Sequence, residues 1–566
     1  MTYRPMSHAA LAAGLLVSVC ACGGGSNNDL PQLSAAVGAA LTSCTDLATR
    51  INIADTTITG ANAVAAGTLT VAGTPVPAHC QVTGRMFPRT GIDGKSYAIG
   101  FEMRLPNDWN GRFFYQANGG IDGSVVTATG AVNGGGGLSN ALKMGFAVIS
   151  SDAGHAGSLG PFFGTDPQAR LDYGYQAVGK LTPMAKSLIQ TAYGKGPDRS
   201  YIGGCSNGGR HTMVAASRYA DQYDGYLVGD PGFRLPLAAI ANIAGAQKYN
   251  ALATTPGDLG SGFTAAERTL VSNAVLAKCD ALDGLSDGTV QDTKSCQAAF
   301  DLSRDVPTCS GARDGSCLSA AQKSSIASLF SGATTSSGSK IYSSFPYDNG
   351  LGTAGWAFWK FTAPLVLDSG GVAIIWGVPP DDPVTFNGAN FALTGDVNTM
   401  LAKVNATNAT FTESAMSFMT PPNRPNLDTL KNRGAKMMIY HGTADPIFSS
   451  DDTTAWYDAV NARYLGAGNF ARFYRIPGMN HCSGGPATDQ FDMLTPLVNW
   501  VEKGQVPESV TARARGTGNA GGVNTDVPAS WAPDRTRPLC PYPQVARYRS
   551  GSAESADSFA CVQPGS

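Results

Sequence analysis

Short apolar runs along this chain predict strands that end in loops rich in glycine and polar residues. Residues 199–203 form one such run, and the pattern of residues 209–219 that follows predicts a helix. Residues 437–440 and 473–476 predict two further strands, and residues 113–120 predict a strand that runs into glycines. A strand, a tight turn and a helix in that order, as around residue 206, form the setting that a nucleophile elbow requires.

The turn between the first predicted strand and its helix is Gly204-Cys205-Ser206-Asn207-Gly208. A Gly-x-Ser-x-Gly motif alone is a modest signal in a chain with 69 glycines, so the flanking strand and helix carry the prediction that Ser206 is a nucleophile. The backbone N–H of Asn207 would be one donor of an oxyanion hole. The glycines after residue 118 offer the second, with Gly120 preferred and the adjacent Gly119 placed against the substrate. The alternative for these glycines is a flexible loop.

Scarcity of histidine narrows the choice of a general base. An α/β-hydrolase places its residues in the chain order serine, acid, histidine, which excludes every histidine before Ser206. Of the six histidines, three follow it: His211, His441 and His481. His211 lies in the elbow helix, where packing or capping is the simpler role, and His441 ends an apolar strand. His481 lies in a glycine-flanked loop, from which it can reach a serine elsewhere in the fold, and we predict it as the base.

The acid follows from the same order of residues. Asp445 is the first carboxylate after the strand 437–440, whereas Asp451 and Asp452 precede a helical pattern and fit better as helix-start carboxylates. In this arrangement Asp445 orients His481 and stabilises its protonated form. His481 takes the proton of Ser206 and later returns it to the leaving alcohol.

Length and charge bound the function classes. With 566 residues the chain is long enough for one large domain with an insertion, or for two to three domains. Charged residues make up 14% of the chain, and the formal net charge is −2, so no overall field attracts nucleic acid or acidic lipid. These partners are not indicated, and the oligomeric state is not predicted.

The N-terminus predicts export. Arg4, an apolar stretch over residues 9–19 and a small-residue processing site over residues 21–26 predict a signal peptide, residues 1–22. The apolar stretch is too short to span a bilayer. Val19-Cys20-Ala21-Cys22 resembles a bacterial lipobox, which would leave a lipid on Cys22; plain signal-peptidase cleavage is the equal alternative. The mature protein would be secreted, periplasmic or an outer-membrane-anchored lipoprotein, with a linker over residues 23–43.

Cysteine content agrees with an oxidising compartment. Two of the twelve cysteines leave with the signal peptide, and the ten that remain predict five disulfides. Local spacing suggests four pairs, which leaves one long-range pair, although ten cysteines allow many connectivities. The pairs are Cys44–Cys80, Cys279–Cys296, Cys309–Cys317, Cys540–Cys561 and, by remainder, Cys205–Cys482. A zinc site is a weaker alternative because the chain has no Cys-x-x-Cys pair and few histidines.

The joined Cys205-Ser206 and His481-Cys482, with Asp445 between them, resemble the tannase and feruloyl esterase family of secreted serine hydrolases. Thr-Gly-Ile-Asp-Gly at 90–94, Trp-Asn-Gly-Arg-Phe-Phe at 109–114 and Pro-Gly-Met-Asn-His-Cys-Ser-Gly-Gly-Pro at 477–486 carry the same similarity, as do residues 166–172 and 537–543. The resemblance implies an α/β fold: an α/β-hydrolase core, with a mostly parallel sheet and flanking helices, over residues 44–232 and 426–566. It also implies a large inserted lid domain over residues 233–425, and the five disulfides.

The lid contains a short acidic loop, residues 279–289, closed by the predicted disulfide Cys279–Cys296. Three carboxylates between glycine turns would repel one another unless a hard cation lay among them, and oxygen ligands suit calcium. The spacing is not that of an EF-hand, and a solvated acidic turn is the alternative. The resemblance implies a structural calcium ion held by five residues: Asp280, Asp283, Leu285, Asp287 and Thr289.

Aromatic residues gather in one part of the lid, at Trp356, Phe358, Trp359 and Trp376. They either sandwich a substrate ring or form the core of the lid. The resemblance implies that Trp359 is a wall of the acyl pocket and that Phe448, three residues after Asp445, is its counterpart from the core.

The quoted segments are most similar to the branch of the family that hydrolyses mono(2-hydroxyethyl) terephthalate, which holds the free carboxylate of its substrate with a lid arginine. Here no Arg or Lys lies between Lys360 and Lys403. An unpaired carboxylate is costly in an apolar pocket. We therefore expect a small ester with a neutral or phenolic acyl group, of the feruloyl, galloyl or hydroxybenzoyl type. Terephthalate monoester hydrolysis is the alternative, and a non-catalytic envelope binding protein is an alternative of another class.

Overall fold

The computed structural model describes residues 1–2, 30–131 and 134–564. Nearly all of the predicted signal peptide, including Cys20 and Cys22, therefore lies outside the described residues, as does the first part of the predicted linker.

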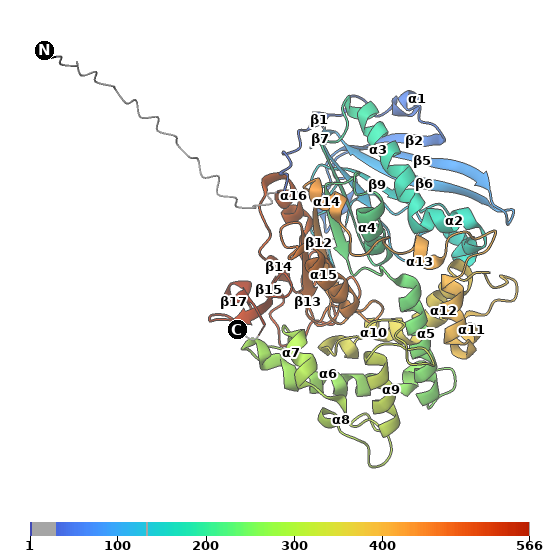
Figure 1. Cartoon of the computed structure of the whole chain (residues 1–566), viewed down its shortest axis with the longest axis vertical. Helices are drawn as coiled ribbons and strands as arrows, with labels where there is room; N and C mark the ends of the chain where they lie inside the picture. The colour runs from blue at the N-terminus through green and yellow to red at the C-terminus, as the bar shows by residue number, and fades with distance from the viewer. Residues whose placement is uncertain (3–29, 132–133, 565–566) are drawn as a thin grey trace.

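A sheet of nine strands forms the centre of the core (Figure 1). The strands from β13 to β9 in the spatial order are parallel, and the pairs β9–β6, β6–β5 and β5–β2 are antiparallel. In spatial order the strands are β13 (Ala471–Ile476), β12 (Lys436–Gly442), β11 (Gly225–Gly229), β10 (Arg199–Cys205), β8 (Arg112–Gln116), β9 (Ala147–Ser151), β6 (Ser96–Pro106), β5 (His79–Thr90) and β2 (Thr56–Val64).

Helices cover both faces of this sheet. Successive residues of a strand point to opposite faces, so Met437 and Ile439 of β12 join one hydrophobic core while Met438 and Tyr440 join another. Helices α3 (Ala177–Tyr193), α4 (Asn207–Arg218) and α15 (Ser450–Tyr464) contribute to the first core, and α16 (Leu494–Lys503) contributes to the second. This three-layer arrangement explains why the central strands are apolar on both faces.

Small elements complete the core around the sheet. Helix α1 (Leu47–Arg50) precedes β2, and α2 (Pro167–Leu171) precedes α3. Four two-stranded pairs are β1 (Ala39–Ala40) with β7 (Asp108–Trp109), β3 (Thr70–Val71) with β4 (Thr74–Pro75), β14 (Val510–Arg513) with β15 (Thr536–Leu539), and β16 (Val545–Tyr548) with β17 (Phe559–Val562).

A helical region is inserted between β11 and β12 and lies below the sheet in Figure 1, coloured green to yellow. We call this region, residues 233–425, the lid. It has a hydrophobic core of its own, which includes Tyr249 and Trp356, and a second cluster of buried residues is shared between the lid and the sheet domain. Its helices are α5 (Leu235–Leu252), α6 (Ala265–Cys279), α7 (Thr293–Ala299), α8 (Leu302–Asp305), α9 (Ala320–Phe330), α10 (Ala354–Ala357), α11 (Gly388–Thr394), α12 (Val397–Asn405) and α13 (Ala415–Phe418); α14 (Asp428–Asn432) leads back to β12.

One lid helix is unusually apolar. Among the described residues, the helical stretch Ala354–Ile375 is long and apolar enough to cross a membrane, but 61% of its most apolar window is buried inside the protein. Burial of that kind is typical of a helix packed in a protein core.

Residues 30–43, which the sequence assigned to a linker, pack along the core. The side-chain amide of Gln32 donates to Val501 O at 2.8 Å, and Arg199 Nε donates to Ser34 O at 2.7 Å. Ala39 pairs with Trp109 in the β1–β7 ladder. This segment is therefore part of the folded domain and not a free connector.

Candidate active site

Ser206 stands at the sharp turn between β10 and α4. Its φ of 67° and ψ of −126° lie in a region that non-glycine residues rarely adopt. A side chain on Gly204 or Gly208 would come within 2.2 or 2.3 Å of Ala117 O, so only glycine lets the turn lie against the end of the neighbouring segment. Steric hindrance therefore requires glycine at both of these positions of the motif. The backbone strain of the elbow lies at Ser206.

Two segments far apart in the sequence bring a histidine and a carboxylate to this serine. His481 Nε2 lies 2.8 Å from Ser206 Oγ, and His481 Nδ1 lies 2.7 Å from Asp445 Oδ2. Because a carboxylate only accepts, Nδ1 carries the proton and Nε2 is free to accept the proton of the serine hydroxyl. We call Ser206, His481 and Asp445 the triad.

The environment of Asp445 keeps it ionised. Asp445 Oδ1 accepts the backbone N–H groups of Ile447 at 2.9 Å and Phe448 at 3.0 Å. Burial works to raise the pKa of this carboxyl, but the charges of His481 and His441 and their hydrogen bonds outweigh burial and hold the pKa well below its usual range. A permanently ionised Asp445 is suited to stabilise a protonated His481.

The contact between His441 and Asp445 was not predicted from the sequence. His441 is fully buried, and its Nε2 donates to Phe448 O at 2.9 Å and lies 3.3 Å from Asp445 Oδ2. Its Nδ1 is 2.9 Å from Thr453 Oγ1. Although burial works to lower the pKa of His441, the hydrogen bond with Asp445 and the charges of Asp230 and Asp445 raise it. The four-residue spacing from His441 to Asp445 was the only sequence signal for this contact.

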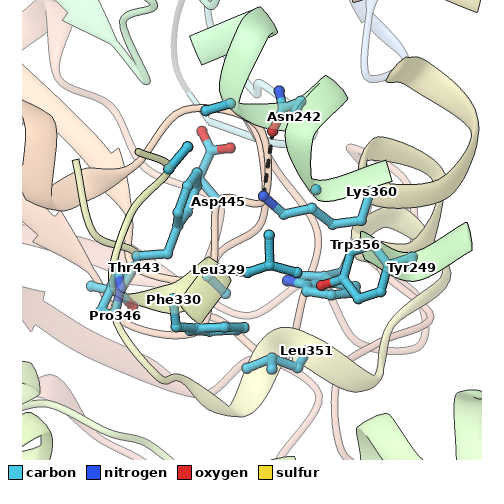
Figure 2. A pocket seen from close by; sticks show the side chains of 15 residues that line it. Asn242, Tyr249, Leu329, Phe330, Pro346, Leu351, Trp356, Lys360, Thr443 and Asp445 are labelled. Carbon is cyan, nitrogen blue, oxygen red and sulfur yellow. Dashed lines mark hydrogen bonds between the residues drawn. The ribbon is translucent and has the colours of Figure 1, made fainter. Parts of the chain in front are cut away.

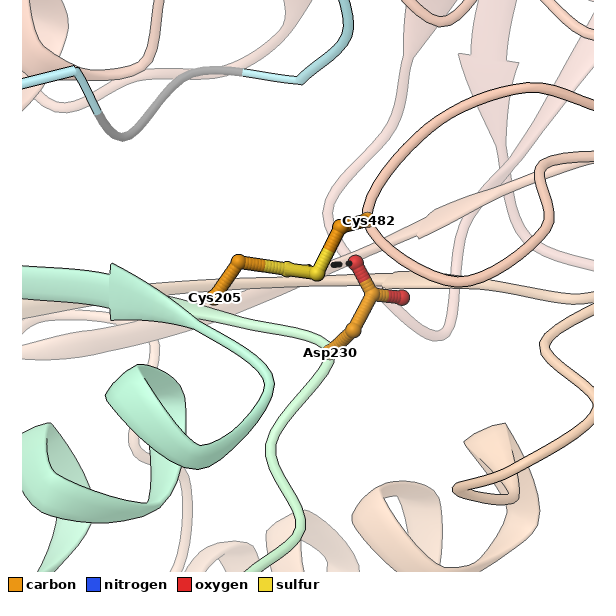
Figure 3. A group of neighbouring side chains, drawn as sticks. All are labelled: Cys205, Asp230 and Cys482. Atoms are coloured by element: carbon orange, nitrogen blue, oxygen red, sulfur yellow. Dashed lines mark hydrogen bonds between the residues drawn. A yellow bond between two sulfur atoms is a disulfide. The ribbon is translucent and has the colours of Figure 1, made fainter. Parts of the chain in front are cut away.

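A disulfide joins the residue before Ser206 to the residue after His481 (Figure 3). The Cα atoms of Cys205 and Cys482 are 6.0 Å apart, and Asp230 Oδ2 lies 3.4 Å from Cys205 Sγ. A disulfide sulfur has no hydrogen to donate, so this is a van der Waals contact. Burial raises the pKa of Asp230, against the charge of His441, which lowers it. Both sulfurs are oxidised, so the group is not a metal site. The other pairs are Cys44–Cys80, Cys279–Cys296, Cys309–Cys317 and Cys540–Cys561, as the spacing suggested.

Two backbone donors stand beside the serine. An added Cβ on Gly119 would lie 3.7 Å from Ser206 Cβ, which places the glycine loop against the elbow. Gly120 has a φ of 64°, and nothing lies within 4 Å of where its side chain would be. Among the described residues, no protein acceptor pairs with the N–H of Gly120, and that of Asn207 is unpaired as the first of its helix.

Two aromatic rings contact the imidazole of His481. The ring centres of Trp359 and Phe448 lie 5.1 and 5.3 Å from it, both edge to face. Phe448 is only 2% exposed and packs against Gly232, so it supports His481 more than it lines open space, whereas Trp359 is half-buried. Of the other lid aromatics, Trp356 and Trp376 are buried in the lid, and Phe358 is 44% exposed.

A narrow, mostly apolar cavity of about 30 Å³ lies between the lid and the core, next to Asp445 (Figure 2). Lys360 extends into it, with Nζ 3.4 Å from Asn242 Oδ1 and 3.8 Å from the centre of the Phe345 ring. Among the described residues, no carboxylate lies within 4.0 Å of this ammonium group. Burial lowers the pKa of Lys360 to about 8, against the charges of Asp445 and Asp368, which raise it. The expectation of no basic residue for a substrate carboxylate concerned only residues between Lys360 and Lys403, and Lys360 itself was missed.

The acidic loop of the lid has oxygen atoms without partners. Asp280 accepts the backbone N–H groups of Asp287, Gly288 and Thr289 at 2.9–3.2 Å, which folds the loop around its carboxylate. Asp283 Oδ2, Asp287 Oδ1 and Thr289 Oγ1 are buried and have no hydrogen-bond partner in the part of the chain that the structure describes. Burial and then the neighbouring carboxylates raise the pKa of Asp283 to about 7, against a hydrogen bond from Leu285 N–H. Unpartnered buried oxygens on three side chains fit a hard cation.

Known proteins support the assignment of the fold. The tannase and feruloyl esterase family matches residues 80–562. The chain is 39% identical to mono(2-hydroxyethyl) terephthalate hydrolase of Piscinibacter sakaiensis, over 88% of this chain and 86% of that protein. It is 26% identical to feruloyl esterase B of Aspergillus niger, over 92% and 95% of the two chains.

Solved structures agree with this result. The crystal structure of feruloyl esterase B from Aspergillus oryzae matches with a TM-score of 0.73 and 24% identity, over 92% of this chain and 99% of that chain. This similarity shows a shared fold, and together with the mixed central sheet it confirms the predicted α/β-hydrolase core with flanking helices. By sequence, the chain belongs to the tannase and feruloyl esterase family.

Proposed function

We propose that this protein is a secreted serine carboxylic-ester hydrolase that cleaves esters of aromatic acids, through an acyl-enzyme on Ser206. The observation that carries the proposal is the pair of hydrogen bonds, 2.8 and 2.7 Å long, that joins an elbow serine to His481 and Asp445. A non-catalytic binding protein would be free to lose any of these side chains, and all three are present and joined. Relatives named for feruloyl and terephthalate esters support an aromatic acyl group.

The geometry supports a two-step reaction. Ser206 Oγ attacks the ester carbonyl carbon while its proton passes to His481 Nε2, and the carbonyl oxygen becomes an oxyanion that accepts from Gly120 N–H and Asn207 N–H. His481 then gives the proton to the leaving alcohol as the carbon–oxygen bond to that alcohol breaks. Water attacks the acyl-enzyme by the same route, releases the acid and restores the Ser206 hydroxyl. Asp445 keeps its charge throughout and stabilises the protonated imidazole.

A specific observation favours a second candidate, hydrolysis of a terephthalate monoester. The Lys360 ammonium group has three N–H donors, but among the described residues it has one hydrogen-bond acceptor, Asn242 Oδ1, which is 3.4 Å away. A cation enclosed beside aromatic rings is stabilised by an anion of matching size, and a free carboxylate on the acyl ring is such an anion. Lys360 immediately follows Trp359, which contacts the base. The 39% identity to a terephthalate monoester hydrolase supports the same candidate.

One comparison of esters tests both candidates. Methyl ferulate, methyl gallate and mono(2-hydroxyethyl) terephthalate are hydrolysed side by side by wild type and by Lys360→Met. We expect serine-dependent turnover of at least one of the three. If Lys360 holds a carboxylate, Lys360→Met lowers kcat/KM for the terephthalate ester by about 10- to 100-fold and leaves the neutral esters within about threefold, because one charge-assisted hydrogen bond is lost.

Lys248→Met is the matched control, because the side chain of Lys248 is on the lid surface and donates to Ser328 Oγ. If Lys360→Met lowers kcat/KM equally for the charged and the neutral esters, Lys360 does not bind a substrate carboxylate. The neutral phenolic esters would then be the preferred substrates. No turnover of any of the three by wild type would contradict the proposed substrate class.

We also propose that the acidic loop of the lid binds calcium for structural reasons, with ligands from Asp280, Asp283, Asp287 and Thr289 and the carbonyl of Leu285. The unpartnered oxygens of three of these side chains support the proposal. Arg537 already pairs with Oδ2 of Asp287, so removal of calcium would leave mainly the carboxylates of Asp280 and Asp283 close together without a shared cation.

Chelation should therefore lower the Tm of the protein by several degrees, and added calcium should restore it, since a ligand that binds only the folded state stabilises it. Differential scanning calorimetry with and without chelator measures the shift. Asp283→Asn should have a lower Tm than wild type in calcium and respond less to the chelator. An unchanged Tm in wild type, with no calcium uptake by titration calorimetry, would contradict the site.

Export is part of the same proposal. Five disulfides are stable in an oxidising compartment, as expected for a secreted or periplasmic enzyme. Anchoring through a lipid on Cys22 stays a prediction, because Cys22 lies outside the described residues.

A further inference from the structure

A buried carboxylate ties together the two segments that carry the proposed oxyanion donors. Asp122 lies two residues after Gly120, and its side chain is 2% exposed. Its Oδ2 accepts from Asn207 Nδ2 at 2.9 Å and from His211 Nε2 at 2.8 Å. The first of these donors belongs to the residue that follows the nucleophile. The glycine loop and the elbow helix α4 are therefore joined directly by a pair of side chains.

The backbone of the loop is held in a conformation that it would not adopt freely. Asp122 has a φ of 57°, in the left-handed region that disfavours residues with a side chain, and it follows Gly120 at 64°. Asp122 N–H donates to Gly119 O at 3.2 Å, so Asp122 closes a turn around the glycine donor. A strained backbone of this kind persists only where contacts with the surroundings hold it in place. The two hydrogen bonds of the Asp122 side chain are such contacts.

The side chain of Asn207, at the start of the elbow helix, is also held in place. Asn207 Oδ1 accepts from Arg210 Nε at 2.5 Å, so both ends of the Asn207 amide are engaged and its orientation is set. The guanidinium of Arg210 is in turn held by Gly174 O at 2.8 Å and Tyr173 O at 3.1 Å. The result is a buried polar network in which each member fixes the next, from the helix through Asn207 to the loop.

Burial of this carboxylate is costly for stability. Burial raises the pKa of Asp122 to about 7, while the charges of His155 and Arg210 and the hydrogen bond from Asn207 lower it. Among the described residues, Asp122 makes no ion pair with Arg210, and its one close charged candidate is His211, whose pKa burial lowers well below its usual value. A hydrophobic side chain would fill the same space without this desolvation penalty. The placement of a carboxylate here therefore points to a positional role.

We infer that Asp122 is a positioning residue that sets the separation of the two oxyanion donors, Gly120 N–H and Asn207 N–H, by binding the side chain of Asn207 from the glycine loop. The inference rests on the proposed acyl transfer at Ser206. Donors stabilise the oxyanion only when they lie at hydrogen-bond distance from its position in the transition state. Release of the loop would move Gly120 N–H away from that position.

Steady-state kinetics of Asp122→Ala and Asp122→Asn test this inference, with p-nitrophenyl acetate as substrate so that acyl specificity does not enter. Asp122→Ala should lower kcat by about 10- to 100-fold with KM within about threefold, somewhat less than deletion of a donor itself. Asp122→Asn should stay within about fivefold of wild type, because a single oxygen, Oδ2, accepts both hydrogen bonds and the amide oxygen can replace it. A merely structural role predicts no such rescue of kcat.

An arylboronic acid, which forms a tetrahedral adduct with the serine, provides a second measurement. Its inhibition constant should rise in Asp122→Ala in proportion to the loss in kcat, whereas inhibition by free benzoate should stay unchanged. Asp152→Ala is the matched control, because Asp152 is a half-buried carboxylate of the same region that accepts Gly100 N–H and Gly154 N–H, both at 2.9 Å. Within the described part of the chain its side chain has no hydrogen bond with Asn207. This control should lose stability and keep kcat within about threefold.

The inference is overturned if Asp122→Ala has a lower Tm but a wild-type kcat, or if the substitution raises KM and leaves kcat unchanged. It is overturned as well if kcat falls and the inhibition constant of the boronic acid does not rise with it. It is also overturned if Asp152→Ala reproduces the full loss in kcat. Turnover of p-nitrophenyl acetate without turnover of any aromatic ester would remove only the proposed substrate class. A wild type that lacks both activities would remove the proposed function together with this inference.

Discussion

Replacement of Ser206 by alanine should lower kcat/KM for an aromatic ester by about 10⁴- to 10⁶-fold, since removal of a nucleophile leaves only the contribution of the remaining site. The change removes one oxygen atom and the hydrogen bond to His481 Nε2, and it leaves His481, Asp445 and both backbone donors in place. Stability should change by only about 1 kcal/mol, because a single hydrogen bond is lost and alanine meets the same positive φ. Initial rates and thermal unfolding of the same preparation separate the two effects.

Ser217→Ala is the matched control, since Ser217 lies in the same helix, α4, ten residues beyond Asn207, and should keep wild-type rates. Activity of Ser206→Ala above about one percent of wild type would mean that another group performs the attack, and that the hydrogen bonds at Ser206 are not those of a nucleophile.

Removal of the Cys205–Cys482 disulfide should have the second largest effect, on stability and on rate. The two cysteines are 277 residues apart, and in the chain-entropy description the closure of such a loop contributes about 5 kcal/mol. The bond also holds the two backbones next to Ser206 and His481, and Cys482 has a left-handed φ of 62°. In Cys205→Ala/Cys482→Ala we therefore expect a kcat about tenfold lower or more, measured well below the Tm, where the variant is fully folded.

Cys309→Ala/Cys317→Ala is the matched control. That disulfide closes only 8 residues within the lid, so its removal should cost about 2 to 3 kcal/mol and leave kcat unchanged. Urea unfolding measures the free energies of unfolding, and initial rates measure kcat. A folded Cys205→Ala/Cys482→Ala variant with undiminished kcat would show that the disulfide stabilises the protein without positioning the triad.

Local patterns predicted the elements that carry the site. The strand before Ser206, the helix after it and the strands before Asp445 and His481 are where the apolar runs placed them, at β10, α4, β12 and β13. These predictions succeed because each rests on a physical requirement within a few residues: glycine at Gly204 and Gly208 for lack of space, and helix-start carboxylates at Asp451 and Asp452 in the first turn of α15. The acid and the base were then predicted from the order of serine, acid and histidine along an α/β-hydrolase chain.

Contacts between distant segments were not predictable in this way. The hydrogen bond between Asp122 and Asn207 joins residues that are 85 positions apart, and no sequence motif links the two. The approach of His441 to Asp445 depends on the direction of a buried side chain. Lys360 was passed over because its role depends on the cavity around it, and only the fold places Asn242 and Phe345 against its ammonium group. Residues 30–43 lack a strong pattern, and their place is set by acceptors such as Val501 O.

Ser206 should carry the acyl group of an aromatic ester as a covalent intermediate. Rapid mixing with the p-nitrophenyl ester of an aromatic acid, followed by an acid quench and peptide mass spectrometry, tests it most directly. We expect a burst of one p-nitrophenol per protein, one added aroyl group on the peptide that contains Ser206, and neither in Ser206→Ala. Rapid turnover with no burst, or with the aroyl group on another residue, would contradict it.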